Sequence, residues 1–153
     1  MCIRDRKEVV PAKPYFLDPT KAFVRLEGKD LTIVSFGPSV KNAMDVADKI
    51  KRQKKILCEV IDLRTIRPID YDTLINSIKK TNRCVTIEEG FPVASIGNHL
   101  SAVIMERAFD YLDAPVINCT GKDVPMPYAA NLEKLALVTT QEVLEAVKQV
   151  TYR

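Results

Sequence analysis

Loops that could carry chemistry follow four apolar segments of this sequence that are rich in β-forming residues. They are Gly37–Ser39, Arg64–Pro68, Glu88–Phe91 and Thr120–Asp123, and the last three hold charged side chains. In an open α/β sheet, ligands bind beyond the carboxyl ends of the strands, so chemistry is expected at these loops. The guanidinium groups of Arg64 and Arg67 could bind a carboxylate or a phosphate, but Glu88 and Glu89 end a neighbouring strand and could neutralise them. The sequence favours structural ion pairing, with Arg67 paired with a strand-end glutamate such as Glu88.

The residue types and spacings predict no catalytic site. Glu88 and Glu89 are adjacent at a strand end and would point to opposite faces, which is poor geometry for joint acid–base catalysis. Gly37 precedes a predicted helix without the glycine pattern or the lysine of a nucleotide-binding loop, so it favours a plain turn. His99 lies off the apolar side of its predicted helix, which favours a surface or subunit-contact role. No serine, cysteine or lysine has a recognisable base partner in the sequence.

Cysteine and histidine usage indicates neither a redox motif nor a metal site. Cys2, Cys58, Cys84 and Cys119 show no C-x-x-C spacing, and the last three lie in apolar, strand-like runs. Those three are expected to be small core residues in a reducing compartment. A metal site needs clustered ligands, and His99 is the only histidine of the chain. We therefore predict no catalytic, cofactor-binding or metal-ligating residue.

Strand-like apolar runs alternate with helical patterns along most of the chain. Strands are expected at Leu31–Phe36, Leu57–Leu63, Cys84–Ile87 and Val116–Cys119. Helices are expected after Pro38, after the N-cap residue Asp70, from about Ser95, and after the capping box that opens at Thr139. Strands separated by helices pair in parallel through right-handed crossovers. The sequence predicts a three-layer α/β/α sandwich around a mostly parallel, doubly wound sheet.

One further strand is expected at Ala22–Leu26, ahead of the parallel part of the sheet. Only Glu27–Asp30 join it to Leu31–Phe36, which is short enough for a hairpin. This segment is therefore expected to be an antiparallel edge strand. Residues 1–20 include three prolines and indicate an extended lead-in, so the domain is expected to span residues 21–153.

The charge balance limits the expected partners. The chain has 153 residues with 23 basic and 20 acidic side chains, for a net charge of +3. This balance does not indicate a nucleic-acid partner, and no apolar run approaches the ~20 residues of a membrane-spanning helix. The one concentrated basic run, Lys49–Lys55, falls at the end of a predicted helix, which favours a solvated helix end over a binding patch.

Four stretches of the sequence resemble one family. They are DLTIVSFGPSV (30–40), EVIDLRTIRPIDYDTLINSIKKTNRCVTIEEGFP (59–92), FDYLDAPV (109–116) and TGKDVPMPYAANLE (120–133). They resemble the C-terminal domain of the β subunit of pyruvate dehydrogenase, within the transketolase C-terminal domain family. The resemblance runs from about Lys13 to the end, and DLRTIRPID and DVPMPYA are its specific segments. Met1–Lys7 fit no part of the pattern and are expected to be an unrelated leader.

The resemblance implies a role within a larger enzyme. In this family an N-terminal domain carries the glutamate that activates thiamine diphosphate, and it precedes the domain seen here. The parent enzyme decarboxylates pyruvate oxidatively and acetylates lipoyl groups, on the way to acetyl-CoA. The resemblance therefore implies that thiamine diphosphate and Mg²⁺ bind outside this chain, which is expected to be a fragment and inactive alone. The implied location is the cytoplasm of a bacterium or the mitochondrial matrix of a eukaryote.

The resemblance also implies protein partners. The β subunit pairs with an α subunit and a second β subunit in an α2β2 tetramer. Its C-terminal domain helps to dock the subunit-binding domain of the dihydrolipoamide acetyltransferase, and that module is basic, so acidic groups near the two-fold axis are implied. The candidates are Asp113 and the terminal carboxylate of Arg153, although Asp113 also fits a simple turn before Pro115.

Three alternatives remain open at the level of sequence. The first is the β subunit of a branched-chain or other 2-oxo acid dehydrogenase. The second is a stand-alone domain that binds an anion through Arg64 and Arg67, and the third is a complete small enzyme.

Overall fold

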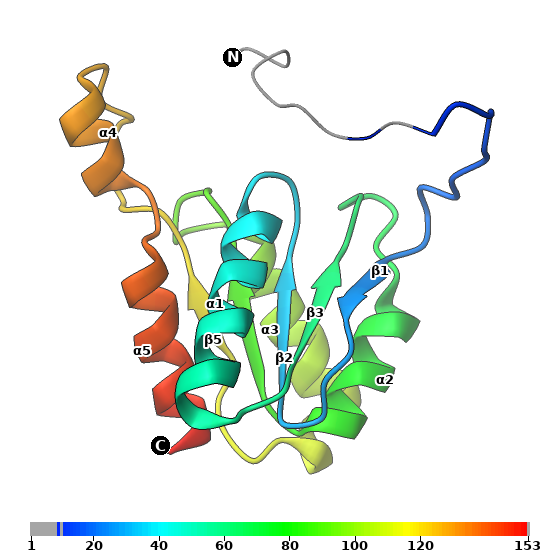
Figure 1. Cartoon of the computed structure of the whole chain (residues 1–153). Coiled ribbons are helices and arrows are strands. Elements are labelled where there is room, and N and C mark those ends of the chain that lie inside the picture. The colour runs from blue at the N-terminus through cyan, green and yellow to red at the C-terminus, as the bar shows by residue number, and fades with distance from the viewer. Residues whose placement is uncertain (1–8, 10, 153) are drawn as a thin grey trace.

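The computed structural model describes residue 9 and residues 11–152, with a five-stranded sheet at its centre (Figure 1). The strands are β1 (Phe23–Leu26), β2 (Leu31–Ser35), β3 (Cys58–Asp62), β4 (Cys84–Ile87) and β5 (Ile117–Cys119). They lie in the order β1-β3-β2-β4-β5, with β1 antiparallel and the others parallel. This sheet confirms the predicted fold class, and the carboxyl ends of β2 to β5 meet at one end of it.

Helices cover both faces of the sheet, as the alternating pattern predicts. One face packs against α1 (Ser39–Lys54) and α5 (Thr140–Thr151), and the other against α2 (Tyr71–Thr81) and α3 (Ile96–Ala108). A 3₁₀ turn, η1 (Phe109–Tyr111), follows α3, and α4 (Ala130–Ala136) stands away from the sheet above its carboxyl end (Figure 1). No helix of the described part of the chain is long and apolar enough to cross a membrane.

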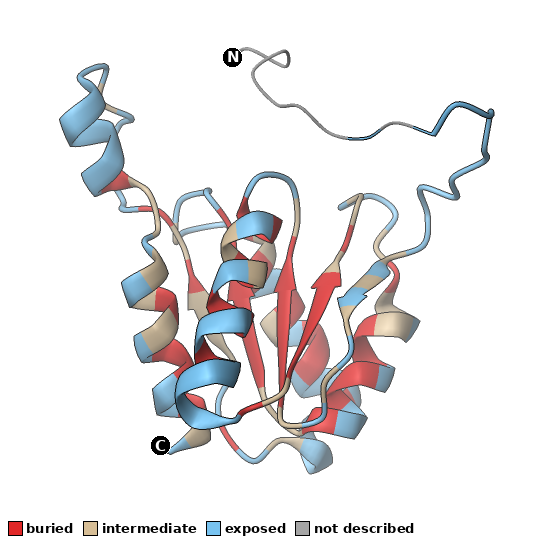
Figure 2. Cartoon of the chain, viewed as in Figure 1, coloured by how far each residue is buried: buried red, intermediate tan, exposed pale blue. Residues whose placement is uncertain are grey.

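Two apolar clusters hold the three layers together. β2 is buried at all of its positions, and its side chains alternate between the two faces. Leu31 and Ile33 belong to the cluster beneath α1 and α5, whereas Val34 belongs to the cluster beneath α2 and α3. Figure 2 shows the buried residues of these helices turned toward the sheet. Each fully buried Leu or Ile stabilises the fold by roughly 1.5–3 kcal/mol.

Three helices begin at side-chain caps, and the sequence predicts two of these caps, at Asp70 and at Thr139. The side chains of Asp70 and Ser95 each accept a hydrogen bond from the main-chain N–H three residues further on. Thr139 and Glu142 form a complete capping box at the start of α5. Each such cap satisfies N–H groups that the helix itself leaves free and contributes about 1 kcal/mol.

The edge strand β1 is antiparallel, as predicted, but the predicted hairpin is wrong. β1 pairs with β3, with Phe23 opposite Asp62, and not with β2, which follows it directly in the sequence. The short connection still reverses the direction of the chain, but β3 lies between the two strands that it joins. It carries the chain past the start of β3 to reach the centre of the sheet.

Gly28 allows the connection between β1 and β2 to pass close to the start of β3. The main-chain N–H groups of Lys29 and Asp30 both donate to Leu57 O, at 3.0 and 3.1 Å, so the connection lies directly against the start of β3. A Cβ atom at Gly28 would lie 2.2 Å from main-chain atoms of Cys58. Only glycine allows the two backbones to approach this closely.

The remaining expectations concern the cysteines, the basic run and the lead-in. Cys58, Cys84 and Cys119 are buried and free, as predicted, and Cys2 lies outside the described residues. The Lys49–Lys55 run forms the exposed end of α1, apart from the buried Ile50. Residues 11–20 contain no helix or strand and are exposed, and the leader expected at residues 1–7 lies outside the described part of the chain.

Candidate functional site

Glu88 is the buried carboxylate at the carboxyl end of the sheet. It follows β4 and is 4% exposed. Its carboxylate oxygens accept hydrogen bonds from the main-chain N–H groups of Ile96 (3.2 Å) and Gly97 (2.7 Å) at the start of α3. A helix N-terminus presents free N–H groups and a partial positive charge, so α3 itself stabilises the ionised side chain. The ion pair with Arg67 that the sequence favours is not formed.

The two arginines of the Arg64–Pro68 loop lie at the strand ends, as predicted, but do not contact Glu88. The Arg64 guanidinium lies 4.6 Å from the centroid of the Phe23 ring, in cation–π geometry. Arg67 is exposed, and its main-chain N–H donates to Thr65 Oγ1 at 3.1 Å. Neither arginine forms an ion pair with another described residue. The loop is therefore held by the contact of Arg64 with the Phe23 ring of β1 and by a local turn. The expected ion pair with Glu88 has no part in holding it.

Polar side chains of three elements hold the start of α3 against the sheet. Thr86 Oγ1 donates to Asn118 Oδ1 at 2.7 Å, and Asn118 Nδ2 donates to Ser95 Oγ at 2.7 Å. The helix approaches so closely that a Cβ atom at Gly97 would lie 2.1 Å from Asn118 Oδ1. A larger residue at position 97 would displace Asn118, so this polar contact requires glycine.

Glu89 lies in a different environment from Glu88, as the sequence predicts. It lines a cavity of about 360 Å³ between the first turns of α1 and α5, which also includes Lys41 and Asp45. Glu88 instead faces α3, on the opposite side of the sheet. The two carboxylates therefore do not form an acid–base pair.

His99 lies on the exposed side of α3, in the surface position that the sequence predicts. Its Nε2 atom and Tyr71 Oη are joined by a hydrogen bond of 2.7 Å. The Arg107 guanidinium lies 5.1 Å from the centroid of the same tyrosine ring. The hydrogen bond between His99 and Tyr71 connects α3 to α2. A role of His99 in a subunit contact stays a prediction.

The described residues offer neither a metal site nor an activated thiol. Within residues 9 and 11–152, no three His, Cys, Asp or Glu side chains lie close enough to hold a metal ion. Burial raises the pKa of Cys58 and of Cys84 to about 12, and that of Cys119 to about 11. These thiols stay protonated at neutral pH and are poor nucleophiles.

Asp113, the predicted partner-binding residue, lies at the opposite end of the sheet. Its side chain is 53% exposed, and its carboxylate forms an ion pair with Arg83 Nη2 at 2.9 Å. Its main-chain N–H donates to Asn82 O at 2.9 Å, beside the start of β4. Tyr152 Oη donates to Asp113 O at 3.4 Å, which brings the end of α5 to this place. Arg153, the second predicted residue, lies outside the described residues.

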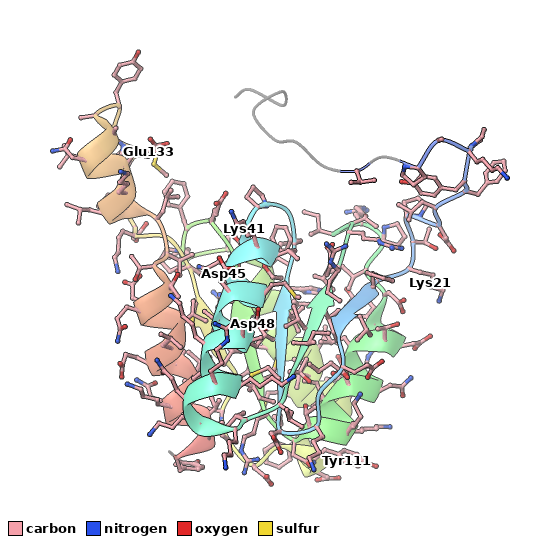
Figure 3. All side chains as sticks on the ribbon, in the orientation of Figure 1. Lys21, Lys41, Asp45, Asp48, Tyr111 and Glu133 are labelled. Atoms are coloured by element: carbon pink, nitrogen blue, oxygen red, sulfur yellow. The ribbon has the colours of Figure 1, made fainter. Side chains whose placement is uncertain are left out.

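The sequence patterns do not predict the projecting segment 122–136. The main-chain N–H of Lys122 donates to Ala136 O at 2.8 Å, which closes the segment at its base. In Figure 3 Glu133 marks α4, which extends away from the sheet. This segment carries five exposed apolar side chains, namely Val124, Met126, Tyr128, Leu132 and Leu135. Prolines interrupt it, so its apolar residues show neither helical nor strand periodicity.

The strand order, the antiparallel edge strand and the helices on both faces define an α/β domain of one known class. The chain belongs to the transketolase C-terminal domain family, whose model matches residues 20–143.

Within this class the chain is similar to pyruvate dehydrogenase E1 component subunit beta. It is 54% identical to the mitochondrial subunit of Dictyostelium discoideum, over 92% of this chain and 39% of that protein. It is 51% identical to the subunit of Rhizobium meliloti (strain 1021), over 95% of this chain and 32% of that protein. The chain therefore spans about a third to two fifths of the length of these curated relatives.

Solved structures support the same class. A split gene transketolase, described as an inactive beta4 tetramer, superimposes with a TM-score of 0.77 and 29% identity, over 95% of this chain and 46% of that chain. A 2-oxoglutarate:ferredoxin oxidoreductase from Magnetococcus marinus superimposes with a TM-score of 0.58 and 14% identity, over 86% of this chain and 20% of that chain. The similarity to the oxidoreductase, at 14% identity, shows a shared fold alone.

Proposed function

We propose that this chain is the C-terminal assembly domain of the β subunit of a thiamine-diphosphate-dependent pyruvate dehydrogenase. The observation that carries this proposal is the 54% identity to an E1 subunit beta across 92% of the chain. The family match over residues 20–143 and the transketolase-like fold support it. The whole enzyme would decarboxylate pyruvate oxidatively and acetylate lipoyl groups.

In this proposal thiamine diphosphate and Mg²⁺ bind in another domain, and this chain alone is inactive. Mg²⁺ bound to a diphosphate needs oxygen ligands, and the buried Glu88 carboxylate is already bound to the main chain of α3. No alternative acidic cluster lies within the described residues. Calorimetric titration of the chain with Mg²⁺ and thiamine diphosphate is expected to give no saturable heat. Stoichiometric binding in the micromolar range would contradict the assignment.

The proposed partners are an α subunit, a second β subunit and the basic subunit-binding domain of a dihydrolipoamide acetyltransferase. Two observations support a docking role for Asp113. Its carboxylate is half-exposed, and the hydrogen bond from Tyr152 brings the residue next to Arg153 close to it. The ion pair with Arg83 orients the Asp113 carboxylate but partly offsets its charge, so the terminal carboxylate of Arg153 would complete the acidic site.

The test uses an assembled E1 enzyme whose β subunit carries this domain. Asp113→Asn keeps the shape of the side chain and removes its charge, so the affinity for the subunit-binding domain is expected to fall at low salt. Removal of Tyr152 and Arg153 should act in the same direction. Decarboxylation with an artificial electron acceptor should not change, and surface plasmon resonance at two salt concentrations measures the affinity.

Asp110→Asn is the matched control, because Asp110 is exposed in the adjacent 3₁₀ turn and forms no ion pair with another described residue. It should leave docking unchanged. Unchanged affinity and salt dependence in both the Asp113 and the truncated variants would show that docking takes place elsewhere. Asp113 would then serve only as the turn residue before Pro115.

The compartment and the exact oxo acid belong to the same proposal. We place the enzyme in a bacterial cytoplasm or a mitochondrial matrix, because its relatives include both bacterial and mitochondrial subunits. The buried, protonated thiols are compatible with a reducing compartment. A substrate competition assay on the assembled enzyme, with pyruvate against branched-chain oxo acids, separates this proposal from the branched-chain alternative.

A further inference from the structure

The end of α1 carries a dense group of basic side chains that the proposed function does not use. Within the range 49–55, five of the seven residues are basic and all five are exposed. Lys29 lies at the same end of the sheet, because its main-chain N–H donates to Leu57 O just beyond the helix. We call these side chains the basic patch, and they are Lys29, Lys49, Lys51, Arg52, Lys54 and Lys55.

The cations of the basic patch are not held in ion pairs by the described part of the chain, and Asp30, which lies beside Lys29, forms no ion pair with the patch within 4 Å. None of the cations forms an ion pair with another described residue within 4 Å. Figure 3 shows the nearest acidic groups of the same helix, Asp45 and Asp48, further toward its start. The rest of the sequence holds 17 basic and 20 acidic side chains, so the positive net charge of the chain comes from this patch.

The helix dipole accounts for only part of this arrangement. Cations near a helix C-terminus are stabilised by about 0.3–1 kcal/mol each, and the effect falls off within the last turn. Lys49 lies before that turn and Lys29 lies on another segment. Several like charges held this close repel one another, and a bound anionic partner would relieve that repulsion.

We propose that the basic patch is a docking surface for an acidic polypeptide segment. Nucleic-acid surfaces combine cations with aromatic side chains on which bases stack, and membrane-binding helices place large apolar side chains beside their cations. The exposed large apolar side chains of the described residues all lie elsewhere, and Gln53 is the only uncharged exposed residue of this end of α1. Four of the five cations on α1 are lysines, whose flexible point charges suit a mobile chain of carboxylates. This inference does not depend on the proposed role in pyruvate dehydrogenase.

The test measures binding of a fluorescent polyglutamate peptide to the whole chain by anisotropy. Binding is expected at low ionic strength and should weaken steeply as salt is added, because screening removes the attraction. The variant Lys51→Gln, Arg52→Gln and Lys54→Gln should weaken binding at least tenfold. Glutamine keeps the helix and most of the side-chain length, and a thermal melt confirms that the variant is folded.

The matched control is Lys13→Gln, Lys41→Gln and Lys134→Gln, which removes the same charge from three exposed lysines elsewhere. It should change the affinity less than twofold. An equal loss in both variants would mean that only net charge matters, and it would overturn the proposal. Tighter binding of a DNA duplex or of phosphatidylserine vesicles than of polyglutamate would also overturn it, since either would identify a different class of partner.

Discussion

Two buried glutamates lie at opposite ends of the sheet and are stabilised in different ways. Glu59 on β3 is 2% exposed and Glu88 after β4 is 4% exposed. The Glu59 carboxylate forms an ion pair with Lys80 and accepts a weaker hydrogen bond from the Gly28 N–H at 3.4 Å. The Glu88 carboxylate forms no ion pair with a cation of the described residues, and it accepts hydrogen bonds from two main-chain N–H groups at the start of α3.

The difference teaches that a buried carboxylate need not indicate a buried cation. Burial alone would raise the pKa of Glu59, but the hydrogen bonds from Lys80 and Gly28 hold it below its ordinary value. Glu88 instead accepts hydrogen bonds from peptide N–H groups at a helix N-terminus, which carries a partial positive charge. The Glu59 site depends on the Lys80 side chain, which a substitution can remove. The Glu88 site depends on main-chain N–H groups, which remain when a side chain is changed.

The largest effect is expected from Glu88→Ala. This change leaves two N–H groups at the start of α3 without an acceptor inside the protein, so the free energy of unfolding should fall by about 2–3 kcal/mol. Urea denaturation followed by circular dichroism measures it. Glu89→Ala, on the exposed neighbour, should cost less than ~0.5 kcal/mol. Equal losses in the two variants would mean that the bonds to α3 contribute nothing.

The next effect is expected from Lys80→Met, which leaves the Glu59 carboxylate buried without its cation. Lys80 is partly exposed and solvent screens its charge, so we expect a loss of about 1–2 kcal/mol in the free energy of unfolding. Lys79→Met is the control, since Lys79 is exposed, lies over the Tyr111 ring and forms no ion pair with another described residue. In a Glu59→Gln background the cost of Lys80→Met should shrink, and a cost that stays constant would contradict the pairing.

Ionisation of Glu59 should also affect how the stability of the fold depends on pH. Because the pKa of Glu59 is lower in the folded than in the unfolded chain, its ionised form stabilises the fold above the ordinary glutamate pKa. That contribution is lost as the pH falls through the folded-state value. The wild type should therefore lose more stability than Glu59→Gln between about pH 6 and pH 3. Parallel curves from thermal melts across this range would show that Glu59 is not the responsible group.

The smallest effect is expected from Arg67→Ala. Its guanidinium is exposed and does not pair with Glu88, so the melting temperature should barely move and the loss should stay below ~0.5 kcal/mol. A loss of several kcal/mol would restore the ion pair that the sequence favours. Added phosphate that stabilises the wild type and not the variant would instead support the anion-binding alternative.

Local signals account for what could be predicted from the sequence. The strand and helix periods, the cap at Asp70 and the capping box at Thr139 depend on neighbours a few residues apart. The buried cysteines followed from the apolar runs around them. Each of these features can be identified from a short stretch of sequence alone. Together they predict where the helices and strands lie and that the strands form a sheet.

What could not be predicted depends on contacts between distant segments. The partner of Glu88 is a main-chain group eight or nine residues away, and a side-chain pattern does not reveal it. Helix α4 has one buried residue, Ala136, so it carries no periodic apolar face. The partner of β1 was missed because a four-residue connection normally indicates a hairpin.

The route of the chain past β3 has a consequence for the order of folding. Phe23 and Asp62 are paired across about 40 residues of sequence, whereas a hairpin partner would lie within ten. β1 can join the sheet only after β3 has formed, because it pairs with the outer edge of β3. It is short, irregular in register and an edge strand, so its amides should exchange with deuterium well before those of the central strand β2. Of the strands β1, β2 and β3, the one that comes first in the sequence is thus expected to join the sheet last.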